Sequence, residues 1–196
     1  MRYLALYGFL GLFFLSCSQV NPLEKRNTRF SHELEQLQSY FSIPGLSAVI
    51  TKDGHIVYEN YLGYSNIEHG TKVDSLTAFP IASITKLFSA TLTMKLVEQN
   101  RLSLNDPVQS YGSDFSFGDS ILVKHILSHT SQGAVGTSFL YSSRFGYLTP
   151  IIEQASGTTF KDAVENEILK PLNLDHTFLL KDSTQLTRQS VNLAST

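Results

Sequence analysis

Phe79-Pro80-Ile81-Ala82-Ser83-Ile84-Thr85-Lys86 leads into the most apolar helix that the sequence predicts. This helix runs from about Ser83 to Gln99, and apolar residues occupy nearly its whole circumference. It has no charged residue between Lys86 and Lys95. A helix that is apolar on every side is normally buried. We therefore expect this helix to lie at the centre of the fold.

Ser83 and Lys86 are three residues apart, a spacing that places two side chains on one helix face with Cβ atoms roughly 5–6 Å apart. Backbone N–H groups at a helix N-terminus lack intrahelical partners and are able to stabilise an oxyanion beside Ser83. Burial makes an amine easier to deprotonate, so Lys86 would serve as a base for the serine hydroxyl. A capping serine beside a lysine that reaches solvent would show the same spacing.

The composition is that of one ordinary domain. The chain has 196 residues, of which 42% are hydrophobic, enough to fill a sizeable core and to exclude wholesale disorder. Its 15 Lys and Arg against 17 Asp and Glu leave no basic excess, which argues against a nucleic-acid partner. A single cysteine excludes an internal disulfide and an all-thiolate metal site.

The N-terminus has the pattern of a targeting segment. Residues 1–16 combine Arg2 with an apolar run from Tyr3 to Leu15, which is the length of a signal-peptide core. Ser16-Cys17 resembles the end of a bacterial lipoprotein signal, in which Cys17 is lipidated and becomes the mature N-terminus. We expect residues 17–27 to be a tether and residues 28–196 the folded domain, anchored to a bacterial membrane on its extracytoplasmic side. An ordinary cleaved signal would instead leave a secreted or periplasmic protein.

The remaining pattern predicts an α+β fold. Apolar periodicity predicts a helix over residues 31–41. Asp53-Gly54 is a strong hairpin turn between strands from Leu46 to Thr51 and from His55 to Tyr64. Shorter helices are expected near residues 123–128, 151–155 and 160–169. No third strand is evident, so the predicted sheet keeps an open edge.

Further segments extend the pattern around Ser83 along the chain. They are Leu96–Val108, His125-Ile126-Leu127-Ser128-His129-Thr130-Ser131, Tyr141-Ser142-Ser143, Ile151–Gly157 and Pro171-Leu172-Asn173-Leu174 with Thr177. In the same order, they resemble the serine β-lactamase and D-alanyl-D-alanine carboxypeptidase family. The resemblance covers nearly all of the predicted mature chain. It implies an antiparallel sheet flanked by helices, with a helical subdomain.

The resemblance also implies roles for individual residues. Ser83 would be the acylated nucleophile, Lys86 its base or proton relay, and Tyr141 the hydroxyl that carries a proton to the leaving group. The substrate would be a small molecule or a peptide: a D-amino-acid peptide, a β-lactam or an ester. No cofactor and no metal are expected. The family usually has Asn where Ser143 stands, and a serine hydroxyl offers a single hydrogen-bond donor to the substrate.

Two other interpretations remain open at this point. In the first interpretation, the chain is a non-catalytic member of the family, either an acyl-binding sensor or an inactive remnant. The serine at position 143 favours that interpretation. Alternatively, His125 and His129 are four residues apart and would share a helical face as zinc ligands do. Ile126 stands where the H-E-x-x-H motif has its glutamate, so structural roles for both histidines are favoured.

The family's third motif is a K-T-G or H-x-G triplet on a strand that lines the site. Neither triplet occurs between Gly157 and Thr196. We therefore expect that the strands pairing with the hairpin are absent from this chain, and that the chain alone is poorly stable and essentially inactive. The alternative is a natural short form whose sheet is completed by a partner or a second copy.

Overall fold

The computed structural model describes residues 22–112 and 120–179. These residues form two compact units. The N-terminal unit contains residues 22–64 and 72–74, and the helical unit contains residues 65–71 and 75–179. Cys17 and the predicted signal peptide lie outside the described residues, as do residues 180–196. No helix in the described ranges combines the length and apolar character that crossing a bilayer requires.

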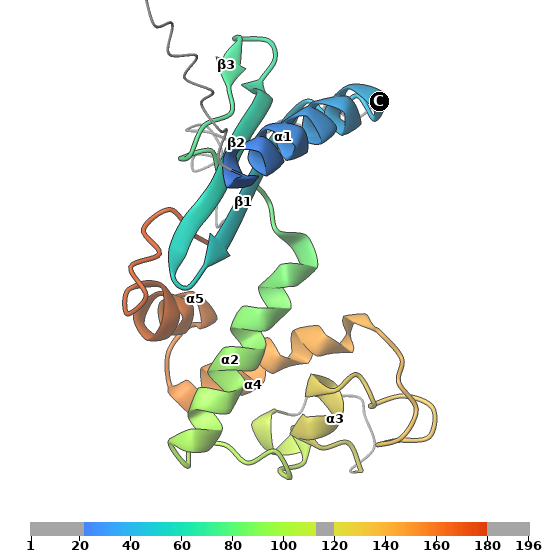
Figure 1. Cartoon of the computed structure of the whole chain (residues 1–196). Helices are drawn as coiled ribbons and strands as arrows, with labels where there is room; N and C mark the ends of the chain where they lie inside the picture. The colour runs from blue at the N-terminus through green and yellow to red at the C-terminus, as the bar shows by residue number, and fades with distance from the viewer. Residues whose placement is uncertain (1–21, 113–119, 180–196) are drawn as a thin grey trace, which may run out of the picture. The chain divides into compact units, whose positions relative to one another are not determined.

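The N-terminal unit is a helix and an antiparallel hairpin (Figure 1). Helix α1 (Pro22–Tyr40) is followed by β1 (Gly45–Lys52) and β2 (His55–Asn66). Asp53 and Gly54 both have positive φ, at 51° and 75°, as a tight hairpin turn of the primed type requires. The predicted hairpin is thus confirmed.

Two details of this unit differ from the expectation. Helix α1 begins at Pro22 rather than near residue 31. The prediction missed its first turns because they are polar and carry no apolar periodicity. The sheet also has a third strand, β3 (Thr71–Lys72), and its order is β1-β2-β3. The expectation that no third strand is present was therefore wrong. Two residues are too few to show the alternation by which a strand is recognised.

Gly63 allows β2 to pass close to the chain that enters β1. Its φ of +72° lies in the left-handed region, and a Cβ at this position would collide with the carbonyl oxygen of Pro44 and the side chain of Gln38. We expect Gly63→Ala to lower the free energy of unfolding by about 2–4 kcal/mol, from backbone strain and overpacking together. Urea denaturation measures this loss.

The matched control is Gly54→Ala at the hairpin turn. Gly54 also has positive φ, at +75°, but its added Cβ would meet nothing within 4 Å. This variant therefore has only the cost of the left-handed backbone, about 1–2 kcal/mol. Equal losses for the two variants would show that the close approach at Gly63 contributes nothing.

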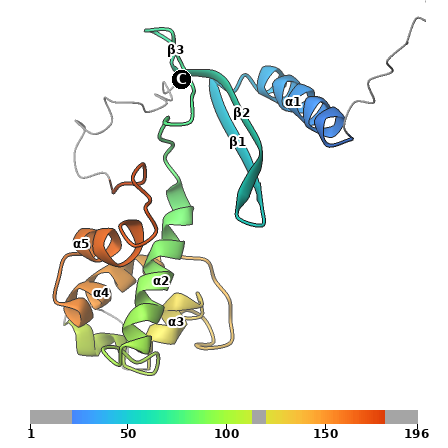
Figure 2. The same ribbon diagram turned by 60° about the vertical axis from the view of Figure 1, so that its left-hand side comes forward.

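The helical unit is built around α2 (Thr85–Glu98), which lies against α4 (Leu148–Ser156) and α5 (Phe160–Val164) (Figure 1, Figure 2). The shorter elements are α3 (Val123–Leu127), the 3₁₀ turns η1 (Ala82–Ile84), η2 (Val108–Tyr111) and η3 (Ser143–Tyr147), and the π-helical turn η4 (Glu165–Leu169). Its core consists of Leu92, Leu96, Leu102, Val108, Ile121, Val123, Ile126, Phe145, Leu148, Ile151, Ile152, Ala163, Val164, Ile168 and Leu169.

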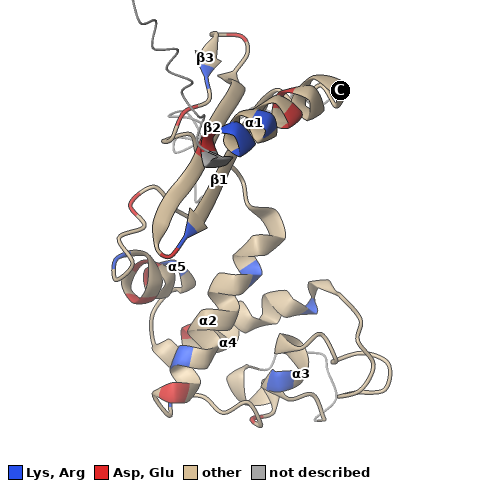
Figure 3. Ribbon diagram, viewed as in Figure 1, with Lys and Arg blue, Asp and Glu red and all other residues tan. Residues whose placement is uncertain are grey.

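Helix α2 is not buried on every side, contrary to the sequence prediction. Leu92 and Leu96 are in the core, but Leu87 is 65% exposed and Met94 is 46% exposed. Figure 3 shows that the ribbon of α2 is uncharged between Lys86 and Lys95. The apolar composition is thus as expected, but the contacts with α4, α5 and η4 bury only the side of α2 that faces them.

Candidate functional site

Ser83 lies in η1, the short 3₁₀ turn that precedes α2. The turn is closed by the Ile84 N–H, which donates to the Ile81 carbonyl at 3.0 Å. Ala82, the residue before Ser83, has a φ of 44°. This left-handed conformation is uncommon for a residue with a Cβ and costs roughly 1–2 kcal/mol. The Ser83 side chain is exposed at this sharp turn and is therefore accessible to a reactant.

Lys86 is half-buried in the first turn of α2 and contacts Ser83 directly. Its Nζ donates a hydrogen bond to Ser83 Oγ at 3.1 Å. The spacing of three residues thus produces the juxtaposition that the sequence predicts, although Ser83 belongs to the 3₁₀ turn and α2 begins at Thr85.

Tyr141 comes from the loop before η3, 58 residues after Ser83 in the sequence, and reaches the same atom. Its hydroxyl donates to Ser83 Oγ at 2.8 Å. Lys86 Nζ lies 4.9 Å from the centroid of the Tyr141 ring. The structure therefore brings together Ser83, Lys86 and Tyr141, the three residues to which the family resemblance gives catalytic roles.

The electrostatics of the cluster favour the ionised form of Tyr141. Hydrogen bonding with Lys86, and next with Ser83, lowers the pKa of the Tyr141 phenol from its ordinary value of 10.0. A nearby cation stabilises a phenolate, so the oxygen that contacts Ser83 accepts and returns a proton more readily than an ordinary tyrosine does. Ser83 Oγ thus has two partners capable of proton transfer.

His129 is a neighbour of this cluster that the sequence did not indicate. Its ring stacks on Tyr141 and on Phe145, with centroids 4.7 Å and 5.1 Å apart. Burial, and then the charge of Lys86, lower the pKa of His129 from 6.5. The sequence gives no sign of this contact, because eleven residues of irregular chain lie between His129 and Tyr141.

The two histidines that form the possible metal motif have backbone partners. Nδ1 of His125 accepts the Leu122 N–H at 3.2 Å, and Nδ1 of His129 accepts the Ser142 N–H at 3.4 Å. Within the described ranges, no three side chains of His, Cys, Asp and Glu come together in a way that could hold a metal ion.

Ser143 is exposed at the start of η3, two residues after Tyr141. The turn is fixed by its neighbours: Ser142 Oγ accepts the Arg144 N–H at 3.2 Å, and Arg144 Nη1 donates to the Ser131 carbonyl at 2.6 Å. Ser143 is therefore an exposed residue in a locally anchored segment, two positions from Tyr141.

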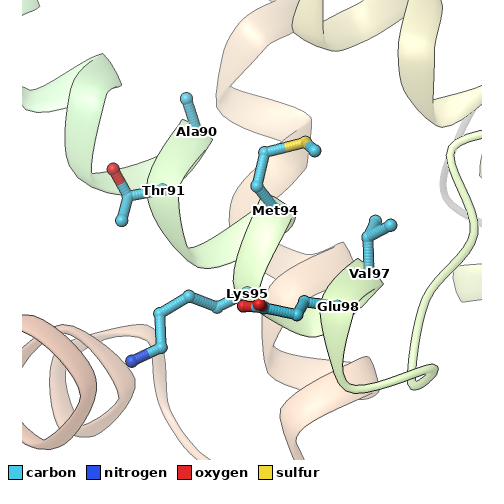
Figure 4. A pocket seen from close by; sticks show the side chains of 6 residues that line it. All are labelled: Ala90, Thr91, Met94, Lys95, Val97 and Glu98. Carbon is cyan, nitrogen blue, oxygen red and sulfur yellow. The ribbon is translucent and has the colours of Figure 1, made fainter.

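An open hollow of about 580 Å³ occurs elsewhere on α2 (Figure 4). All six residues that line it come from α2 itself: Ala90, Thr91, Met94, Lys95, Val97 and Glu98. None of the three clustered residues lines this hollow, so it is a surface feature distinct from the site at Ser83.

Sequence and structure comparisons with known proteins point to the same family. A sequence model of the family described as Beta-lactamase matches residues 31–191. A protein of Bacillus subtilis (strain 168) named penicillin-binding protein PbpX is 28% identical, over 72% of this chain and 44% of its own length. The chain thus spans less than half of that relative.

Two solved structures have the same fold over most of this chain. An octameric penicillin-binding protein homologue from Pyrococcus abyssi is 25% identical, with a TM-score of 0.76 over 84% of this chain and 46% of its own. A class C beta-lactamase is 24% identical, with a TM-score of 0.76 over 88% of this chain and 55% of its own. The α+β arrangement, with an antiparallel sheet and helices, is therefore that of β-lactamases and penicillin-binding proteins. This chain belongs to the beta-lactamase family.

Proposed function

We propose that the protein is a serine hydrolase that transfers an acyl group from an amide or ester substrate through an ester at Ser83. One observation carries the proposal: Ser83 Oγ is hydrogen-bonded by Lys86 Nζ at 3.1 Å and by the Tyr141 hydroxyl at 2.8 Å. A serine is a weak nucleophile unless a neighbouring group removes its proton, and here two neighbours are within reach.

The proposed reaction has two halves. Ser83 Oγ attacks the substrate carbonyl carbon, and its proton passes to whichever of Lys86 Nζ and the Tyr141 oxygen is deprotonated. The tetrahedral oxyanion then collapses, the C–N or C–O bond to the leaving group breaks, and Tyr141 delivers a proton to the departing amine or alcohol. Water hydrolyses the ester on Ser83, which releases the acid and restores the serine hydroxyl.

The family and Ser143 support the proposed substrate class. D-amino-acid peptides, β-lactams and simple esters all present a carbonyl that such a site attacks. A serine at position 143 supplies one hydroxyl donor where an asparagine would supply an amide with two. We therefore expect weak turnover of β-lactams and better turnover of simple esters, which need fewer contacts to amide groups.

Covalent labelling tests the proposal. A form of the protein that includes all the active-site segments, incubated with a fluorophosphonate or a penicillin probe, should gain the mass of one adduct, and peptide mapping should place the adduct on Ser83. Ser83→Ala should lose the adduct, whereas Ser110→Ala, a change at another exposed serine of the helical unit, should retain it. Unchanged labelling of Ser83→Ala would contradict the assignment. A stable penicillin adduct without turnover would favour the second candidate, an acyl-binding sensor with Ser143 in place of Asn.

We also propose that Cys17 is lipidated and anchors the protein to a bacterial membrane, on the basis of the apolar leader that ends in Ser16-Cys17. Expressed in bacteria, the wild-type protein should incorporate labelled fatty acid and sediment with membranes. Cys17→Ala should do neither, because it has no thiol to be lipidated. The wild-type anchor should be stable, because a lipoprotein terminus carries several acyl chains and stable anchoring needs more than one. Equal membrane recovery of both forms would exclude this mode of attachment.

A further inference from the structure

His129 makes three contacts with the short segment that carries Tyr141. Its carbonyl oxygen accepts the Leu140 N–H at 2.8 Å, and its ring Nδ1 accepts the Ser142 N–H at 3.4 Å. Its ring stacks on the Tyr141 ring, with centroids 4.7 Å apart and planes inclined by 29°. One residue therefore holds the backbone on both sides of Tyr141 and also supports its side chain.

His129 is also fixed by contacts with residues outside the Tyr141 segment. Its N–H donates to the Ile126 carbonyl at 3.2 Å, and its ring stacks on Phe145, whose side chain is only 6% exposed. Its φ of 57° is uncommon for a residue other than glycine. Strained residues of this kind persist where the surrounding structure fixes them, and they often occur at functional sites.

The contact with Ser142 requires a neutral imidazole. Nδ1 accepts a hydrogen bond only when it carries no proton, and both ring nitrogens are donors in the protonated form. Burial and the charge of Lys86 lower the pKa of His129, so the ring is neutral at pH 7. The interaction is therefore present under ordinary conditions.

We propose that His129 is a positioning residue that holds the Tyr141 hydroxyl against Ser83 Oγ. The functional part of this inference rests on the proposed acyl transfer at Ser83. The geometric part does not, because it concerns only where Tyr141 lies. A displacement of about 1 Å from a productive geometry is able to slow a reaction roughly a hundredfold, so a residue that never touches the substrate still affects the rate.

Two substitutions separate this role from a general contribution to folding. Asn tolerates left-handed backbone and places an acceptor close to the position of Nδ1, so His129→Asn keeps the contact with Ser142 but loses the ring. Gly also tolerates this backbone but keeps neither feature. Thermal unfolding followed by circular dichroism establishes that each variant folds.

The first measurement is the ionisation of Tyr141, which does not depend on any covalent chemistry. The ¹³Cζ resonance of labelled tyrosine reports its titration, and the resonance missing from Tyr141→Phe assigns it. Because Lys86 and Ser83 lower the pKa of Tyr141, a displaced ring should titrate closer to the ordinary value of 10.0. We expect a clear upward shift in His129→Gly and a smaller shift in His129→Asn. An unchanged titration in His129→Gly would overturn the proposal.

The second measurement is the rate at which a fluorophosphonate labels Ser83, with Tyr141 present and with Tyr141→Phe. With Tyr141 present, we expect His129→Gly to slow labelling roughly ten- to a hundredfold and His129→Asn to recover part of that loss. Once the Tyr141 hydroxyl is gone, His129→Gly should slow labelling no further. The same loss in both backgrounds would assign His129 a purely structural role. If a form of the protein that includes all the active-site segments is not labelled but its Tyr141 titration responds to His129, the acyl-transfer proposal fails and the positioning role stands.

Discussion

Lys86→Met is expected to slow covalent labelling of Ser83 by a factor of about 10²–10⁴, which is the usual contribution of a positioned general base or acid. Lys86 Nζ lies 3.1 Å from Ser83 Oγ, and it also stabilises the ionised form of Tyr141. Methionine keeps an unbranched apolar stem of similar length but removes the amine. The loss therefore combines direct proton transfer with the effect of Lys86 on Tyr141, and it is measured as the second-order rate of adduct formation with a fluorophosphonate.

Lys95→Met provides the matched control on the same helix. Lys95 forms an ion pair with the Glu167 carboxylate at 3.0 Å and donates to the Glu167 carbonyl at 2.9 Å, so its amine is engaged away from Ser83. This substitution should leave the labelling rate unchanged. If Lys86→Met is labelled as fast as the wild-type protein, Lys86 is not the base.

Ile151→Ala should lower the free energy of unfolding by about 2–5 kcal/mol. Ile151 is fully buried on α4, in the core that α4 shares with α2. The substitution removes apolar surface from the core and leaves a cavity that rigid neighbouring helices fill only in part. Urea denaturation should show a lower midpoint with an unchanged slope.

Two further variants make this measurement decisive. Ile151→Val removes a single methylene and should cost about 0.5–1.5 kcal/mol, so it reports on the site even if the alanine variant does not fold. Gln154→Ala changes an exposed residue of the same helix and should alter stability by less than about 0.5 kcal/mol. Equal effects of Ile151→Ala and Gln154→Ala would mean that α4 does not pack as described.

Local chemistry explains which parts of the fold were predictable. Asp53-Gly54 specifies the β1–β2 hairpin because few dipeptides tolerate two successive positive φ values. Strand β3 was missed because its two residues are recognisable only through their pairing with β2. The exposure of Leu87 and Met94 was missed for a related reason: composition indicates that a helix is apolar, but not which of its faces has a neighbour.

In the candidate site, too, some contacts were predictable from the sequence and others were not. Helical spacing alone predicts that Lys86 approaches Ser83. Tyr141 is far from both in the sequence, and only the resemblance to a known family suggested that it joins them. The stacking of His129 on Tyr141 depends on how a loop folds back, and neither spacing nor composition reports that contact. Likewise, nothing in the residue type of Ala82 indicates its φ of 44°.

The conformation of Ala82 also narrows the paths by which this position is able to evolve. Single-nucleotide changes of an alanine codon reach Gly, Asp, Glu, Ser, Thr, Pro and Val. Proline cannot adopt positive φ, and Val and Thr are strongly disfavoured there because they branch at Cβ. Aspartate tolerates the backbone but would place a carboxylate on the residue adjacent to Ser83, changing the electrostatics of the site. Of these seven residues, only glycine has no Cβ and adopts positive φ without a steric penalty, so glycine is the replacement that best preserves this turn.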